Sequence, residues 1–239
     1  MSQSFEIVEE KLREAAFFLD GLRTAGQLSF EARCYFSAFV SAARTVTLAL
    51  QVTMKHIDGF NAWYEQAQAR LKADPLARFF VEVRNDSVHK GLNPLGQVPM
   101  EHLREHLSLQ FRQRKRSHVI VLPDPRAGHG TALADAVQVS SEYFKSLVAV
   151  VFDCYDRFRC VVDPRWYFTR ENFLAMGKTF EDAVEELGLP RTWADCAPNE
   201  TDAWRILRSQ QPACLINDIF WLYTGRSISD PDGLEDVPK

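Results

Sequence analysis

The sequence predicts a mainly α-helical protein: an antiparallel helical bundle with a short irregular or β-like insert and a small helical C-terminal appendage. Apolar residues recur at three- and four-residue spacing, the helix-start signals Ser29 and Asp74-Pro75 precede such runs, and short connections separate them. A hydrophobic fraction of 46% in 239 residues is enough for a sizeable core. We divide the chain into the bundle, residues 1–162, the appendage, residues 163–226, and an acidic tail, residues 227–239, which we expect to be mobile.

The bundle helices follow from these apolar patterns. Helices are expected at Ile7–Leu22, from Ser29 to about Leu50, at Phe60–Leu71, at Pro75–Lys90 and from about Leu133 to Val162, with Gly21–Gln27 connecting the first two. Pro75 suits the first turn of its helix because its missing N–H is not needed there, and Gly91 suits a left-handed C-cap. Helices joined by short connections predict a bundle.

The insert and the appendage have weaker patterns. His118–Leu122 is typical of a short strand before a turn-rich segment. In the appendage, Thr169 is an expected N-cap, and Thr179 with Asp182 resembles a capping box. The large aromatic residues of the appendage are expected to form its core rather than to stack on bases; they are Trp166, Tyr167, Trp193, Trp204 and Trp221.

The composition restricts location and partners. A formal charge of −4 means that any contact with nucleic acid needs a local basic patch. The five cysteines are odd in number and form no Cys-x-x-Cys pair, which indicates reduced thiols and a cytoplasmic protein. The first residues lack a signal-peptide pattern, and no apolar run approaches the roughly 20 residues of a membrane span. We expect no cofactor and no metal, since there is no Gly-rich phosphate loop and His102 and His106 have no second ligand cluster.

The most informative stretch is FFVEVRNDSVHKG, residues 79–91, which contains three polar groups near the end of a predicted helix. Asn85 and His89 are four residues apart and share a helix face, whereas Arg84 lies about 100° round and must use its long side chain to reach them. An imidazole exchanges protons near neutral pH, and a guanidinium matches the geometry of a phosphate. These are the two needs of RNA cleavage by its own 2′-hydroxyl, a reaction that requires no metal. Arg84, Asn85 and His89 are therefore the candidate catalytic residues.

The arrangement Arg84, Asn85 and His89 resembles the Arg-x(4–6)-His motif of HEPN domains, in which a polar residue commonly follows the arginine. The likeness covers roughly residues 5–162, and the appendage adds nothing to it. The resemblance implies a helical bundle, a homodimer that brings two motifs into one composite cleft, and a role as an RNA-cutting toxin or defence effector. Helix two of some relatives carries an acidic residue facing the motif. In this sequence the polar face of the second predicted helix carries Ser37, Ser41 and Arg44, and no carboxylate is evident there.

A basic segment with an interleaved phenylalanine is the best local candidate for contact with an RNA backbone. Its cations are Arg104, Arg112, Arg114, Lys115 and Arg116. A basic run is also typical of a solvated face, so the sequence leaves both interpretations open.

Three hypotheses remain on the sequence alone. The first is a metal-independent HEPN-type ribonuclease that binds RNA and acts as a homodimer. The second is a non-catalytic helical protein that binds RNA or a protein partner through the same residues. The third is a toxin or defence subunit held silent by an antitoxin or another regulatory protein.

Overall fold

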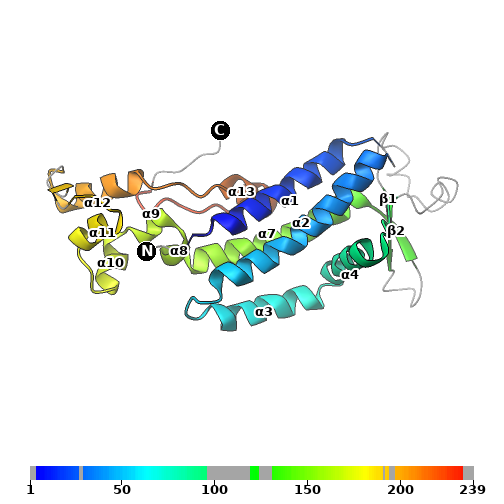
Figure 1. Cartoon of the computed structure of the whole chain (residues 1–239), viewed down its shortest axis with the longest axis horizontal. Helices are drawn as coiled ribbons and strands as arrows, with labels where there is room; N and C mark the ends of the chain where they lie inside the picture. Colours follow the sequence, from blue (N-terminus) through cyan, green and yellow to red (C-terminus); the bar gives the residue numbers. More distant parts are fainter. Residues whose placement is uncertain are drawn as a thin grey trace. The chain divides into compact units, whose positions relative to one another are not determined.

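The computed structural model describes residues 4–26, 29–95, 119–123, 131–190, 192–193 and 197–233, and the chain is mainly helical (Figure 1). It divides into two compact units. The bundle unit is Glu10–Val148, and the C-terminal unit is Met1–Glu9 together with Ala149–Lys239. The fold class expected from the sequence, a mainly α-helical bundle, is confirmed.

In its described residues, the bundle unit is built from long helices and a β-hairpin. Its elements are α1 (Glu6–Thr24, from Glu10 onward), α2 (Phe30–Met54), α3 (Phe60–Ala73), α4 (Pro75–Lys90), β1 (Val119–Pro123), β2 (Thr131–Asp135) and α7 (Ala136–Arg157, up to Val148). Figure 1 shows α2 beside α1 and α7, and α4 packs against both α2 and α3. The helix that carries the three residues singled out by the sequence is therefore held by two neighbours.

Aromatic packing fixes α4 in the bundle. Phe80, which is fully buried, lies 6.2 Å from Phe36 and 6.0 Å from Phe39 of α2 between ring centroids. Its ring also stacks in parallel on Tyr143 of α7 at 4.5 Å. Such pairs add to the burial of their own apolar area. Phe80 therefore ties the helix that carries the candidate site to two others.

The predicted limits of α4 and the predicted start of α2 are confirmed, and each depends on capping chemistry; α2 continues to Met54, beyond the expected end at Leu50. The Asp74 carboxylate accepts a hydrogen bond from the Leu76 N–H at 2.8 Å, with Pro75 in the first turn. The helix ends at Gly91, whose φ of 66° is left-handed. Ser29 caps α2 by accepting from the Ala32 N–H at 3.0 Å. These side chains satisfy backbone donors that a helix start leaves without partners.

The predicted connection Gly21–Gln27 is wrong in its first part, because α1 continues to Thr24. A Cβ atom at Gly21 would lie only 2.5 Å from the Tyr35 ring of α2. Glycine is therefore required there for close packing between two helices and not for a turn.

The insert contains an antiparallel hairpin in which Ile120 pairs with Ala134. A strand was expected at His118–Leu122, and β1 confirms it with a shift of one residue. The expected start of the late helix at Leu133 is wrong, because Leu133 belongs to β2 and α7 begins at Ala136. Periodicity cannot distinguish a short apolar strand from a helical turn, and the pairing with β1 decides the outcome.

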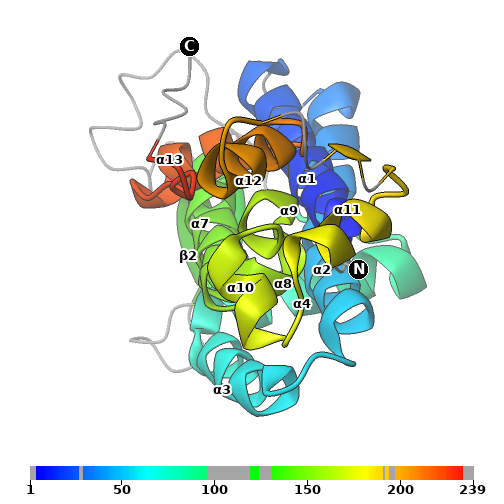
Figure 2. The same ribbon diagram turned by 90° about the vertical axis from the view of Figure 1, so that its left-hand side faces the viewer.

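The C-terminal unit continues α7 with a series of short helices: α8 (Arg159–Val162), α9 (Pro164–Tyr167), α10 (Arg170–Ala175), α11 (Phe180–Glu186), α12 (Glu200–Ser209) and α13 (Asn217–Thr224). α9 packs against α10 and α12, and α10 also packs against α11 (Figure 2). The expected caps at Thr169 and at Thr179 with Asp182 are both present. Of the aromatic residues expected in the core, Tyr167 and Trp204 are buried, whereas Trp221 is exposed.

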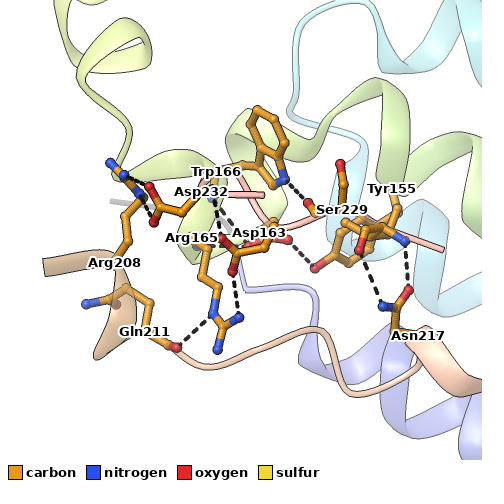
Figure 3. Close-up of polar contacts among 11 residues, drawn as sticks. Tyr155, Asp163, Arg165, Trp166, Arg208, Gln211, Asn217, Ser229 and Asp232 are labelled. Atoms are coloured by element: carbon orange, nitrogen blue, oxygen red, sulfur yellow. Dashed lines mark hydrogen bonds and ion pairs between the residues drawn. The ribbon is translucent and has the colours of Figure 1, made fainter. Parts of the chain in front are cut away.

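A polar network holds the end of the described chain in this unit (Figure 3). The Asp163 carboxylate accepts hydrogen bonds from the backbone N–H of Arg165 at 2.8 Å and from the Tyr155 hydroxyl at 3.1 Å. Arg165 pairs with Asp230 at 2.8 Å, and Arg208 pairs with Asp232. The acidic segment that was expected to form a tail is thus in contact with the helices as far as it is described, to Gly233. Its last residues, 234–239, lie outside the described residues.

Membrane insertion was not expected from the sequence. Among the helices that the structure describes, none combines the length and the apolar character that crossing a membrane requires.

Candidate functional site

The last two turns of α4 carry the three residues singled out by the sequence. Asn85 and His89 are exposed, and Arg84 is half-buried. At about 100° per residue, Asn85 and His89 face the same direction, opposite to the buried Phe80 and Val83. The two residues therefore lie on the solvent side of a helix whose other side is anchored in the core.

Arg84 reaches that solvent side. Its Nη1 donates a hydrogen bond to Oδ1 of Asn85 at 3.3 Å, so the guanidinium folds round the helix toward the exposed face. The bond also directs the amide of Asn85. Within the described ranges, the imidazole of His89 makes no hydrogen bond or ion pair. The structure thus brings Arg84 to Asn85 and leaves His89 one turn further along on the same face.

The end of α4 is held by several hydrogen bonds. Gly91 N–H donates to the carbonyl of Ser87 at 3.2 Å, and Leu92 N–H donates to the carbonyl of Asp86 at 3.3 Å. The bond from Gly91 to the carbonyl four residues earlier is that of an αL C-cap, and a left-handed glycine makes it possible. Beyond it, the side chain of Asn93 donates to the backbone carbonyl of Arg33 in α2 at 3.0 Å. The helix end is therefore a firm platform for the exposed side chains.

A second link to α2 lies inside the motif itself. The hydroxyl groups of Ser87 and Ser37 are 3.2 Å apart and share a hydrogen bond. Ser37 belongs to the polar face of α2, and its hydroxyl supports the end of α4 through a neutral hydroxyl pair.

One ion pair lies next to the site in α4, while the exposed Glu82, three residues before Asn85, forms none with the described residues. Lys90 binds Asp86 at 2.8 Å, and both side chains are about half exposed. The pair neutralises the carboxylate nearest to His89 in sequence, although an exposed pair adds little to stability. Arg84 forms no ion pair with any described residue, so its positive charge is available to an anion.

Other candidates from the sequence fall in different places. The cations Arg104, Arg112, Arg114, Lys115 and Arg116 lie outside the described residues. His102 and His106 also lie outside them. In the described part of the chain, no three His, Cys, Asp or Glu side chains gather in a way that could hold a metal ion.

The cysteines of the described chain are unpaired, and two of them are unsuited to nucleophilic chemistry. Cys154 is fully buried, and burial raises the pKa of its thiol. Burial also raises the pKa of Cys214 to about 12. A thiol must ionise to act as a nucleophile, so these two groups are inert near neutral pH.

Two charged residues that the sequence analysis did not single out extend the same face of α4. Arg78 and Glu82 precede Asn85 by seven and three residues, and both are exposed. Residues three, four and seven positions apart lie on one side of a helix. The spacing Arg78, Glu82, Asn85 and His89 could have been recognised from the sequence as one continuous stripe.

The chain was compared with known protein families, curated proteins and solved structures. The model of a family described as Bacteriophage lambda protein ea47 matches residues 27–157, which is more than half of the chain and includes all of α2, α3 and α4. Neither the curated proteins nor the solved structures contain a match.

Proposed function

We propose that this chain, which belongs to the family of bacteriophage lambda protein ea47, is a metal-independent endoribonuclease of HEPN type with Arg84, Asn85 and His89 as its site. The observation that carries the proposal is the hydrogen bond from Arg84 to Asn85 on the exposed face of α4, one turn before the exposed His89. This arrangement joins a phosphate-binding cation, an orienting amide and a proton-transfer group on one rigid helix end.

The reaction is attack by a ribose 2′-hydroxyl on the adjacent phosphorus. The new bond joins O2′ to phosphorus, the bond from phosphorus to O5′ breaks, and the products carry a 2′,3′-cyclic phosphate and a 5′-hydroxyl. His89 transfers protons, either from O2′ or to O5′. Arg84 stabilises the charge that develops on the phosphoryl oxygens, and Asn85 orients the phosphate or the guanidinium.

A homodimer is part of the proposal. One imidazole can act as base or as acid at a given moment, whereas the displacement needs both, so two copies of His89 in one composite cleft meet the requirement. Exposed apolar side chains beside the site support association there: Val88 is 55% exposed and Leu92 44% exposed. RNA as substrate, a cytoplasmic location and a toxin or defence role controlled by an antitoxin belong to the same proposal.

The test compares variants of the full chain on labelled RNA. We expect His89→Ala and Arg84→Gln each to reduce cleavage at least a hundredfold, in line with the loss of a proton-transfer group or an electrostatic stabiliser. His56→Ala and Arg13→Gln are matched controls, because both side chains are exposed in the bundle unit away from the motif in sequence. Equal activity of the His89 and His56 variants contradicts the proposal.

A second function is favoured by one observation. Catalytic histidines are usually oriented through their second ring nitrogen, and in the described residues His89 has no such hydrogen bond. The same exposed stripe would then bind RNA or a protein partner without cutting. Retention of intact RNA by the wild-type protein, lost in Arg84→Gln, is the result that this alternative predicts.

A further inference from the structure

The bundle unit contains a groove between α2, α3, α4 and α7, which we call the α3–α4 groove, with a volume of about 310 Å³. Small-molecule sites in proteins have volumes of about 300–1,000 Å³, so this groove is at the lower end of that range. Its floor includes Tyr64, Tyr143 and Leu147, and its rim includes Arg44, Lys72 and Arg78. The candidate catalytic residues are not among its lining.

The rim of the groove is cationic. Arg44 donates from Nη1 to the hydroxyl of Thr47 at 3.0 Å, a neutral partner that leaves its charge uncompensated. Lys72 and Arg78 are exposed and form no ion pair with any residue that the structure describes. Glu82 is the carboxylate among the lining residues, and Asp74, near Tyr143, is engaged as the cap of α4. Three cations around one carboxylate favour an anionic ligand.

The floor of the groove is apolar and firmly held. Tyr143 stacks on Phe80 with ring centroids 4.5 Å apart, and the hydroxyl of Tyr64 donates to the carbonyl of Thr47 at 3.1 Å. Both tyrosine side chains are buried, with 5% of Tyr64 and 4% of Tyr143 exposed. A preformed apolar floor beside cations is complementary to a nucleotide, which has a flat base and a charged phosphate.

We propose that the α3–α4 groove binds one nucleotide of a single-stranded RNA, with the base against the floor and the neighbouring phosphate on Arg78 and Lys72. This inference rests on the proposed ribonuclease function and adds its substrate class. Arg78 lies on the same face of α4 as Asn85 and His89, about 10 Å and about 16 Å before them along the helix axis. A strand of RNA that runs along α4 reaches both the groove and the site. The base that enters the groove must be unpaired.

The test measures binding of a fluorescent single-stranded oligonucleotide with 2′-O-methyl riboses, which lacks the attacking hydroxyl and so cannot be cut. Fluorescence anisotropy on the full chain gives the dissociation constant at several salt concentrations. We expect Arg78→Gln and Lys72→Gln each to weaken binding roughly tenfold, since each removes a charge-assisted contact to phosphate. Each should also reduce the slope of log affinity against log salt by about 0.7, the value for one phosphate of a single strand.

Two controls separate this inference from the proposed function. Arg13→Gln should bind as the wild type does, and His89→Ala should bind within a few-fold of it while cutting nothing. Equal affinity and equal salt slope for Arg78→Gln, Lys72→Gln and Arg13→Gln would overturn the groove proposal, even if the protein cuts RNA. Weakened binding in the two groove variants supports it, even if no RNA is cut. A duplex of the same sequence that competes as well as the single strand contradicts the requirement for an unpaired base.

Discussion

Gly91 sets the end of the helix that carries the candidate site, and its φ of 66° is a conformation that side chains with a Cβ adopt at a cost. A Cβ there would meet no atom within 4 Å, so the cost of substitution is conformational and not steric. We expect Gly91→Ala to lower the free energy of unfolding by about 1 kcal/mol and Gly91→Asn by less, because asparagine tolerates left-handed backbone. Urea unfolding of both variants measures the difference. Equal stability of the alanine variant and the wild type would contradict the assigned cap.

Ser140 is fully buried, and its hydroxyl oxygen has no hydrogen-bond partner in the described part of the chain. Burying a hydroxyl without a partner costs about 1–3 kcal/mol. Ser140→Ala should therefore raise the free energy of unfolding by about 1 kcal/mol. Ser146→Ala is a suitable comparison, because that exposed hydroxyl bonds to the Glu142 carbonyl at 3.4 Å and should contribute little. A destabilised Ser140 variant would show that the hydroxyl has a partner.

At the scale of elements, the cap of α4 can be tested directly. Asp74 accepts from the Leu76 N–H at 2.8 Å and starts the helix that presents Arg84 and His89. Removal of such a cap costs about 0.5–2 kcal/mol, so we expect Asp74→Ala to lower the unfolding free energy by that amount. Asp58→Ala, at an exposed position outside the helices, should change it by less than about 0.5 kcal/mol. If both variants unfold at the same urea concentration, the capping contact does not stabilise α4.

Helix starts and ends could be predicted where local chemistry determines them. Asp74-Pro75 and Gly91 limit α4, and Thr179 with Asp182 starts α11, because these side chains and backbone angles act within one turn. Gly21 was misassigned to a turn because the Tyr35 ring that excludes a side chain comes from another helix. Leu133 was misassigned to a helix because its strand partner lies in β1. Local periodicity does not predict contacts between segments that are distant in the sequence.

The part of the candidate site that depends on local spacing could also be predicted from the sequence. The shared face of Asn85 and His89 follows from their spacing, and the structure places both on the solvent side. The hydrogen bond from Arg84 to Asn85 depends on a side-chain conformation, which the spacing leaves open. The α3–α4 groove joins residues from four helices, so no single stretch of sequence indicates it.

At the scale of the whole molecule, buried acids make stability depend on pH. Burial raises the pKa of Glu9 above its ordinary value of 4.5, although the Leu215 N–H donates to its carboxylate at 3.3 Å. Burial likewise raises the pKa of Asp163 above 3.8. Between the ordinary and the raised values, the folded state holds more protons than the unfolded state. The contribution of each group to stability therefore falls as pH rises through that window.

Glu9→Gln removes one of these charges and keeps an acceptor for Leu215. We expect the variant to gain stability over the wild type at pH 7, because burial disfavours the charge that the carboxylate gains freely in the unfolded state, and to gain less at about pH 4. Thermal unfolding at the two pH values measures both differences, with the exposed Glu10→Gln as the control. A gain that is larger at acid pH than at neutral pH would contradict the sign of the shift.

The most direct test of the ribonuclease proposal is the chemical identity of the product ends. The 239-residue chain is incubated with labelled total RNA and tRNA in excess chelator, in parallel with its His89→Ala variant, and the chemical groups at the ends of the products are determined. We expect the wild type alone to produce 2′,3′-cyclic phosphate and 5′-hydroxyl ends. Intact RNA with the wild-type protein, equal cleavage by His89→Ala, or products with 3′-hydroxyl ends would contradict it.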